Sequence, residues 1–285
     1  MMVFDIISRF GKCGLEDVNQ RAPLLTRTDN KYVLSTNQIQ ALLLETRKDF
    51  SVLTLNATNN FRYQNKYLDT PDGVCFLDHK QGRRRRMKMR FRHYVDSGKF
   101  FFELKLKGRR GITEKFRQPI SAEDFEKQQL TNSLRAFSNS VLIERYGRFL
   151  TGLYVPALNV NYERLTLLSN SGSERITIDH SIHFQLGEFD YTTFDNFWVV
   201  EVKSRSGRTA VDKYLVRTGS RTVKSCSKYS VGFQISRRGG GSSRFTPTIR
   251  KFCRLEDVHD PQVVEIPYED QKTCASLPAK TLVLT

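Results

Sequence analysis

The stretch Arg83–Lys107, RRRRMKMRFRHYVDSGKFFFELKLK, decides how the rest of this chain is interpreted. Successive side chains of a strand point to opposite faces, so residues two apart share a face. On that spacing the first half of the stretch has a cationic face and an apolar face. The cationic face holds Arg84, Arg86, Lys88, Arg90 and Arg92, and the apolar face holds Met87, Met89 and Phe91.

The second half of the stretch returns after a turn at Asp96-Ser97-Gly98. It places Glu103, Lys105 and Lys107 on one face and Phe102, Leu104 and Leu106 on the other. The sequence therefore predicts a long hairpin with one apolar side and one cationic side. Because neighbouring like charges repel, such a face is stable only in water or around a polyanion.

The composition indicates a basic, globular protein. The chain has 285 residues, a formal net charge of +16 and 39% hydrophobic residues. This charge predicts an anionic partner. No apolar run is long enough to span a bilayer, and the first residues lack the features of a secretion signal, so we expect a cytoplasmic protein without a transmembrane segment. The five cysteines form no CxxC pair, which argues against structural zinc.

Further segments repeat the alternation of charged and apolar residues. Their charged faces hold Asp29 with Lys31, Lys115 with Arg117, Tyr162 with Arg164, Arg175 with Asp179, and Glu201 with Lys203. A solvated face is the simplest explanation for any one strand, but it explains at least six such strands poorly. We therefore predict an α+β fold in which an antiparallel sheet closes into a barrel. The cations would face inward and helices would cover the apolar outside.

A closed cationic interior requires a compensating anion. A triphosphate or polyphosphate fits, because each phosphate offers oxygens to arginine and lysine. The isolated acids Asp29, Glu103, Asp179 and Glu201 each lie two residues from a base. Carboxylates beside phosphate oxygens favour Mg²⁺ or Mn²⁺, so these four are candidate metal ligands.

Eight motifs occur in the order seen in a known family: RTDNKYVL, YLDTPDG, RMKMRFRHY, FELKLK followed by TEKFR, YERL, RITID, VVEVK and SKYSVG. The chain thereby resembles the VTC domain, the polyphosphate polymerase domain of vacuolar transporter chaperone complexes and of stand-alone bacterial relatives. That domain belongs to the triphosphate tunnel metalloenzyme (CYTH-like) superfamily. The resemblance implies an eight-stranded antiparallel tunnel barrel over residues 1–236. A change of composition at residue 237 predicts a peripheral, partly disordered tail over 237–285.

The resemblance also implies an activity, namely metal-dependent (Mn²⁺ or Mg²⁺) phosphoryl transfer from ATP or another triphosphate to a growing polyphosphate chain. It implies that Lys31 is needed for turnover and that Glu201 binds the metal, with Lys203 beside it and Lys228 at one end of the tunnel. The implied phosphate ligands are Arg90, Arg92, Lys105, Lys115, Arg164 and Arg175. The hairpin pattern adds Arg86 and Lys88. Eukaryotic members have glutamate at the position of Asp29, and aspartate keeps the charge with a shorter reach.

Several alternatives stay open at this stage. The same tunnel could hydrolyse triphosphate or short polyphosphate if water replaced the acceptor, or could bind polyphosphate without catalysis, although Glu201 and Lys31 argue against a pure binder. Arg83–Arg86 alone resembles a nuclear-localisation or nucleic-acid patch. The aromatic residues, however, lie opposite the cations, which argues against a nucleic-acid partner. Glu103 could be a salt-bridge partner and Asp179 a turn residue. Any membrane partner would be a separate protein.

Overall fold

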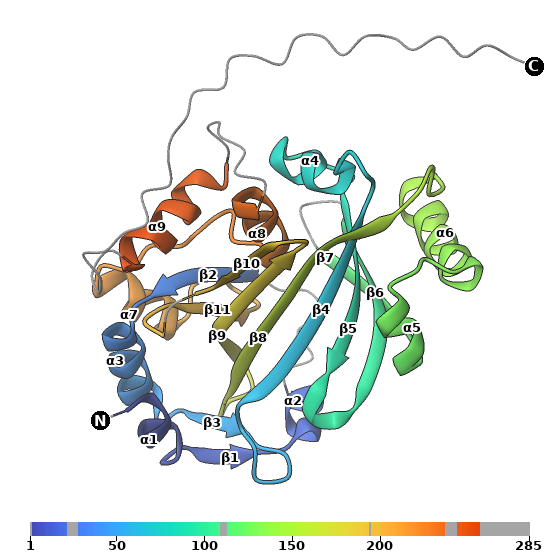
Figure 1. Ribbon diagram of the computed structural model, residues 1–285. Coiled ribbons are helices and arrows are strands. Elements are labelled where there is room, and N and C mark those ends of the chain that lie inside the picture. The colour runs from blue at the N-terminus through green and yellow to red at the C-terminus, as the bar shows by residue number, and fades with distance from the viewer. Residues whose placement is uncertain (1, 22–27, 109–112, 194, 237–243, 257–285) are drawn as a thin grey trace, which may run out of the picture.

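An eleven-stranded sheet forms the centre of the molecule (Figure 1). The computed structural model describes residues 2–21, 28–108, 113–193, 195–236 and 244–256. The main path of the sheet runs β2-β11-β9-β8-β4-β5-β6-β7, and all neighbours along it are antiparallel. These strands are β2 (Thr28–Leu34), β4 (Phe61–Asp69), β5 (Met87–Tyr94), β6 (Lys99–Lys107), β7 (Thr113–Pro119), β8 (Val155–Ser169), β9 (Glu174–Leu186) and β11 (Trp198–Ser204).

The strand register places the predicted charged residues on one face of the sheet, which we call the inner face. Directly paired residues of neighbouring strands point to the same side. The pairs that define the inner face are Lys31 with Glu201, Asp29 with Lys203, Lys203 with Arg175, Arg164 with Asp179, Arg90 with Glu103, and Lys105 with Lys115. The predicted hairpin is present as β5 and β6, with Lys88 opposite Lys105.

The sheet is not closed into a barrel, contrary to the prediction. Among the described residues no pairing joins β2 to β7, the strands at the two ends of the main path. Closure would bring Lys115 and Arg117 of β7 toward Lys31 of β2, and these like charges repel. The main path has the expected eight strands. Three shorter strands lie beside it: β1 (Gly11–Cys13) is parallel to β3 (Phe50–Leu53), and β10 (Phe189–Thr192) pairs with β9.

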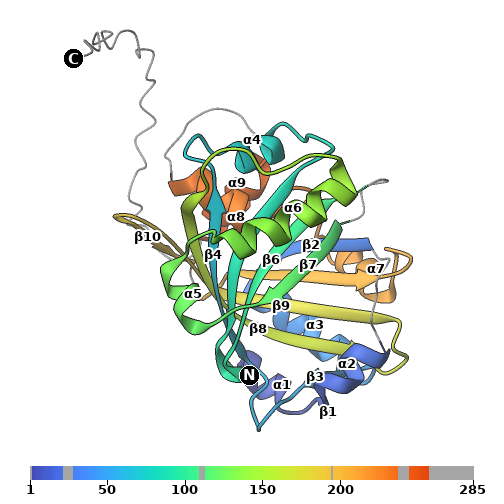
Figure 2. The same ribbon diagram turned by 90° about the vertical axis from the view of Figure 1, so that its right-hand side faces the viewer.

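Helices cover the apolar outer face in two groups. α1 (Val3–Ile7), α3 (Thr36–Thr46) and α7 (Ala210–Arg217) share a core with β8, β9 and β11. α5 (Ala122–Lys127) and α6 (Asn132–Tyr146) share a core with β5 and β6, and lie across these strands in Figure 2. In the second core Phe91, Phe102 and Phe125 are fully buried, which stabilises the fold by about 2 kcal/mol for each side chain. α2 (Leu15–Arg21) precedes β2.

Another helix, α8 (Lys228–Ser236), lies against the apolar part of the inner face and packs on β8 and β9. A Cβ atom added at Gly232 would lie 2.2 Å from the Phe184 ring and 2.9 Å from Leu158, so only glycine permits this close approach. α4 (Val74–Lys80) contacts α8. α9 (Thr246–Glu256) also packs on α8.

Two segments differ from the sequence predictions. Residues 69–73, DTPDG, are typical of a turn, yet they lead directly into α4, because the buried Asp69 carboxylate accepts hydrogen bonds from the backbone N–H groups of Cys75 and Phe76 at 2.7 and 2.9 Å. The strand predicted to begin at Arg83 begins at Met87, so Arg83–Arg85 lie in the connection between α4 and β5 and Arg84 does not belong to the strand face.

The domain boundary at residues 236/237 stays a prediction. The Phe245 side chain is buried and lies 5.9 Å from the Phe76 ring, centroid to centroid. Residues 237–243 and 257–285 of the predicted tail lie outside the described residues. No helix in the described ranges is long and apolar enough to cross a membrane.

Candidate functional site

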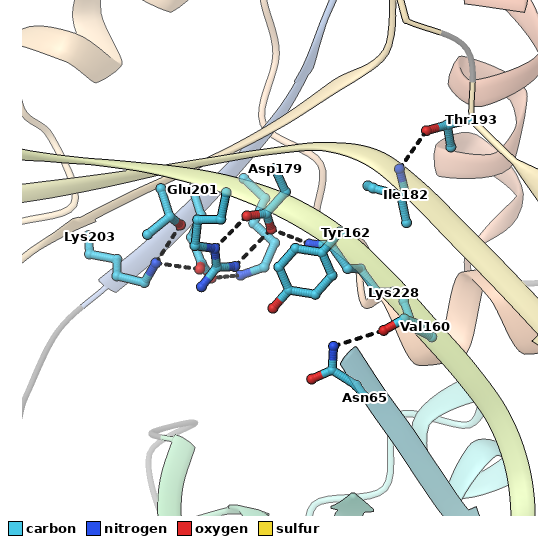
Figure 3. A network of polar contacts seen from close by, with 12 residues as sticks. Asn65, Val160, Tyr162, Asp179, Ile182, Thr193, Glu201, Lys203 and Lys228 are labelled. Atoms are coloured by element: carbon cyan, nitrogen blue, oxygen red, sulfur yellow. Dashed lines mark hydrogen bonds and ion pairs between the residues drawn. The ribbon is translucent and has the colours of Figure 1, made fainter. Parts of the chain in front are cut away.

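Glu201 on β11 lies between two lysines of the inner face (Figure 3). One carboxylate oxygen pairs with Lys31 of β2, and the other lies 2.5 Å from the Lys203 ammonium. Lys203 also donates to the Thr177 hydroxyl at 2.8 Å. Burial alone would raise the pKa of Glu201, but Lys203 and Lys31 hold it well below its usual value. Glu201 is therefore ionised, and its charge is shared by two ammonium groups.

Asp179 on β9 organises a second group. The Arg164 guanidinium binds both carboxylate oxygens, at 2.5 and 2.8 Å, and Lys228 at the start of α8 pairs with one of them. Burial would raise the pKa of Asp179, but Arg164 and Lys228 lower it. The strand continues beyond this residue, so Asp179 is not a turn residue. α8 is thereby tied to the charged part of the inner face.

Glu103 on β6 organises a third group and is fully buried. Arg90 donates to it from two nitrogens, at 2.9 and 2.5 Å, and Lys115 approaches its other oxygen to 3.2 Å. Arg92 is held by the Asn65 carbonyl oxygen and the Tyr162 hydroxyl, both at 2.8 Å. Burial would raise the pKa of Glu103, but Arg90, Arg92 and Lys115 hold it well below its usual value. The salt-bridge alternative for Glu103 agrees with this geometry.

Tyrosines fill the space between the second and third groups. The Tyr162 ring stacks on Tyr63, with centroids 5.1 Å apart. The Arg164 guanidinium lies 5.1 Å and the Lys228 ammonium 4.5 Å from the Tyr162 ring centroid. Cations over aromatic faces gain electrostatic stabilisation. Tyr162 therefore packs on Tyr63 and also orients the cations on both sides of it.

Some inner-face cations lack such partners. The Lys105 ammonium has no hydrogen bond or ion pair with any described residue. Its pKa is lowered well below the usual value by Arg90 first, then by burial and by Arg92. Arg86 has a buried Nε atom without a hydrogen-bond partner in the described part of the chain. The inner face thus carries surplus positive charge that its carboxylates do not neutralise.

The sheet curls so that charges from both ends of the main path influence one another. Figure 2 shows β6 and β7 running across the direction of β9. The pKa of Lys88 on β5 is lowered to about 7, by burial first and then by the positive charges of Lys31 and Arg86. Lys107 on β6 is also affected by Lys31. Lys31 belongs to β2, which is not a neighbour of either strand, so the cations face a common space.

Residues 26–237 match the family model of the VTC domain. This chain belongs to the VTC domain family. The match confirms the resemblance that the sequence motifs indicated. No curated protein matches the chain.

Several solved structures are similar to this VTC domain at low sequence identity. The putative adenylyl cyclase HpAC1 from Hippeastrum, described as having a dominant triphosphatase activity, is 15% identical, with 72% of this chain and 93% of that chain covered and a TM-score of 0.47. A putative adenylate cyclase from Bacillus halodurans is 13% identical, with 70% of this chain and 93% of that chain covered and a TM-score of 0.41. A putative adenylate cyclase from Vibrio parahaemolyticus is 14% identical, with 67% of this chain and 81% of that chain covered and a TM-score of 0.35. These values concern the fold alone.

The carboxylates that the structure describes in this VTC domain are spread over several strands. The described residues contain no group of three or more His, Cys, Asp or Glu side chains that could hold a metal ion. Mg²⁺ is, however, often bound by one or two carboxylates together with substrate phosphates. Glu201 fits this arrangement, because its side chain is 18% exposed and each of its oxygens contacts only an ammonium group of a flexible lysine.

The other three predicted metal ligands are placed differently. Glu103 and Asp179 have 0% and 3% side-chain exposure, and each holds an arginine. Asp29 lies opposite Lys203 in the register, next to Glu201. The metal roles of these residues stay predictions, as do the phosphate contacts of Arg175, which pairs with Lys203 across β9 and β11.

The sequence interpretation missed several residues that shape the VTC site. The alternation places Thr177 on the same face as Arg175 and Asp179, but it did not show that Thr177 accepts a hydrogen bond from Lys203. Asn65 and Tyr67 alternate on β4 and hold Arg92 and Arg90, at 2.8 and 3.0 Å. An amide and a phenol give no charge signal in a single sequence, and only the strand pairing shows which cations they contact.

Proposed function

We propose that this VTC domain is a metal-dependent phosphotransferase. It would bind a nucleoside triphosphate on the inner face and transfer the terminal phosphoryl group to polyphosphate. One observation carries the proposal: cations outnumber carboxylates on the inner face, and within the described residues Lys105 has no hydrogen bond or ion pair and the buried Nε of Arg86 has no hydrogen-bond partner. Buried cations require anions, and a run of phosphates offers oxygens to several of them in succession. Family membership supports polyphosphate as the acceptor.

The arginines would bind and orient the phosphates. Phosphoryl transfer depends mainly on positioning and charge neutralisation. Arg90 and Arg92 are already fixed by Glu103 and Asn65, so they can receive phosphate oxygens without reorganisation. Arg164, fixed by Asp179, would do the same from β8.

The lysines at Glu201 would act at the transferred group. Burial lowers the pKa of Lys31, but Glu201 more than offsets this and the pKa is raised, so Lys31 stays protonated. It can therefore neutralise charge that develops on the leaving oxygen. A divalent cation, when bound by Glu201 and phosphate oxygens, would neutralise further charge on the transferred group.

The balanced reaction needs no general base. A terminal oxygen of the polyphosphate forms a new bond to the γ-phosphorus, and the bond from that phosphorus to the β–γ bridging oxygen breaks, which releases the nucleoside diphosphate. The terminal phosphate is already anionic near neutral pH, because its last proton has a pKa near about 6.

The test is incubation of the purified chain with ATP and Mn²⁺, followed by gel separation of long phosphate chains from free phosphate. Long chains are expected, and their formation should be lost in Glu201→Gln. If orthophosphate were the sole product, the protein would be a hydrolase that acts in the same site and not a transferase. If neither product formed although tripolyphosphate still bound, the protein would be a binding module without catalytic activity.

A further inference from the structure

Arginines from three segments gather beside the inner face, near the ends of α4 and α6. They are Arg83, Arg84, Arg85, Arg148 and Arg244, which we call the outer arginine cluster. Arg85 donates to the backbone carbonyl of Tyr146 at 3.1 Å, and Arg148 donates to that of Arg85 at 3.5 Å. Arg244 donates to the carbonyl of His79 at 3.3 Å. Backbone carbonyls thus hold the guanidinium groups of Arg85, Arg148 and Arg244 in place without neutralising them.

The cluster carries little compensating negative charge. Its ion pair in the described part of the chain joins Arg83 to Asp78 at 3.3 Å. Arg244 of the cluster and the inner-face cations Lys88 and Arg86 all act on His79 of α4. The pKa of His79 is lowered to about 2, by burial first and then by Lys88, Arg86 and Arg244.

Arg86 connects the cluster to the inner face. One of its guanidinium nitrogens donates to the Arg83 carbonyl at 2.5 Å, and its buried Nε has no partner among the residues described. Its own carbonyl accepts from the backbone N–H of Lys107 at 3.0 Å, which extends the pairing of β5 and β6 by one residue. Cations therefore continue without interruption from Lys88 and Lys107 through Arg86 to the outside.

We propose that the outer arginine cluster binds the part of a polyphosphate chain that extends beyond the inner face. The inference rests on the proposed function for the identity of the chain. Continuity of charge favours this occupant, because Arg86 contacts the Arg83 segment, and a chain bound at Lys88 and Arg86 would therefore meet the cluster with its next phosphates. Binding at two linked sites makes long chains bind more tightly than triphosphate without any change in the inner face. The cluster would thereby select for chain length.

The test compares two ligands, tripolyphosphate and a polyphosphate of about a hundred units, by calorimetric titration in moderate salt. In the wild-type protein the long chain should bind more tightly per molecule than tripolyphosphate. The triple variant Arg83→Gln, Arg84→Gln and Arg85→Gln should weaken long-chain binding roughly tenfold and leave the tripolyphosphate Kd unchanged. These three side chains are exposed, and because Arg83 pairs with the buried Asp78, urea unfolding of the triple variant checks that the fold is retained.

The matched control removes the same charge elsewhere, with Arg9→Gln, Lys12→Gln and Lys48→Gln on exposed positions of the N-terminal elements. It corrects for the loss of net charge, and its long-chain affinity should stay within about twofold of wild type. Equal losses in both triple variants would overturn the inference and leave the proposed function standing. The inference would also be overturned if the triple variant of Arg83, Arg84 and Arg85 lost binding to RNA or to anionic vesicles but kept its binding to polyphosphate. A wild-type protein that bound neither ligand would overturn both proposals.

Discussion

Glu103 and Glu201 lie on opposite sides of the inner face in the same chemical setting, each two residues from a lysine and each neutralised by two or more cations. They differ in burial and in the kind of cation. Glu103 is fully buried and held mainly by arginine, whereas Glu201 keeps 18% exposure and is held by two lysines. Arginine forms a rigid fork with carboxylate, and lysine is a flexible point charge.

The difference assigns different roles to two carboxylates that look alike in the sequence. Removing the buried partner of an arginine leaves an uncompensated guanidinium in the core. The lysines at Glu201 can instead move toward an incoming phosphate and release the carboxylate to a metal. We therefore expect Glu103 to support the structure and Glu201 to act in turnover.

The largest expected effect is on turnover in Glu201→Gln. The rate of polyphosphate synthesis should fall at least about a thousandfold, because the amide cannot replace the carboxylate at the metal or keep Lys31 in position. The Kd for tripolyphosphate should change by less than about threefold, since the cations remain. Rates with ATP and Mn²⁺ and calorimetric titration of tripolyphosphate measure the two quantities. Wild-type turnover in this variant would remove Glu201 from the mechanism.

Glu103→Gln should produce the largest loss of stability. The free energy of unfolding should fall by about 3 kcal/mol, because Arg90 is only 5% exposed and loses its charged partner. Urea unfolding followed by tryptophan fluorescence provides the measurement. The matched change Glu201→Gln should cost clearly less, and the pair Glu103→Gln with Arg90→Met should recover part of the loss. If Glu201→Gln were the more destabilising of the two, the comparison would be reversed.

Replacing Lys105 should have a smaller effect than either glutamate change, and it should stabilise the unliganded protein while weakening ligand binding. Replacing it by glutamine should raise the free energy of unfolding of the unliganded protein by about 1 kcal/mol, because Lys105 is repelled by Arg90 and Arg92. The same change should weaken tripolyphosphate binding roughly tenfold, since one charge-assisted hydrogen bond is lost. Lys12→Gln, at an exposed position of β1, should change neither quantity. A destabilised Lys105→Gln protein with unchanged affinity would show that Lys105 has a structural role.

Alternation within strands predicted which residues share the inner face, because the two-residue period depends only on backbone geometry. The pairing of Arg90 with Glu103 and of Lys203 with Glu201 follows from that period together with strand register. Closure of the sheet could not be predicted in this way, since it depends on repulsion between strands far apart in the sequence. Neither could the helical course of residues 74–80, where the Asp69 carboxylate caps a helix after a sequence typical of a turn.

The smallest predicted effect concerns pH and Lys88, whose pKa in the unliganded protein is lowered to about 7. A bound phosphate raises this pKa, so below pH 7 the lysine is protonated before and after binding. Above pH 7 the free protein has lost the proton and must take it up on binding, which weakens the apparent affinity. The Kd for tripolyphosphate should therefore rise roughly tenfold between pH 6.5 and 8.5.

Lys88→Arg separates this effect from other titrations. Arginine stays protonated throughout the range, so most of the pH dependence should disappear while the affinity at pH 6.5 is retained. Lys203, with a pKa lowered to about 8 chiefly by burial, adds a dependence of the same sign at higher pH in both proteins. Titration of the ligand is also common to both proteins and cancels in the ratio of their Kd values. A ratio that did not change with pH would mean that the Lys88 ammonium does not face the bound phosphates, and the binding region would then be limited to the arginines fixed by Glu103 and Asp179 and to the lysines at Glu201.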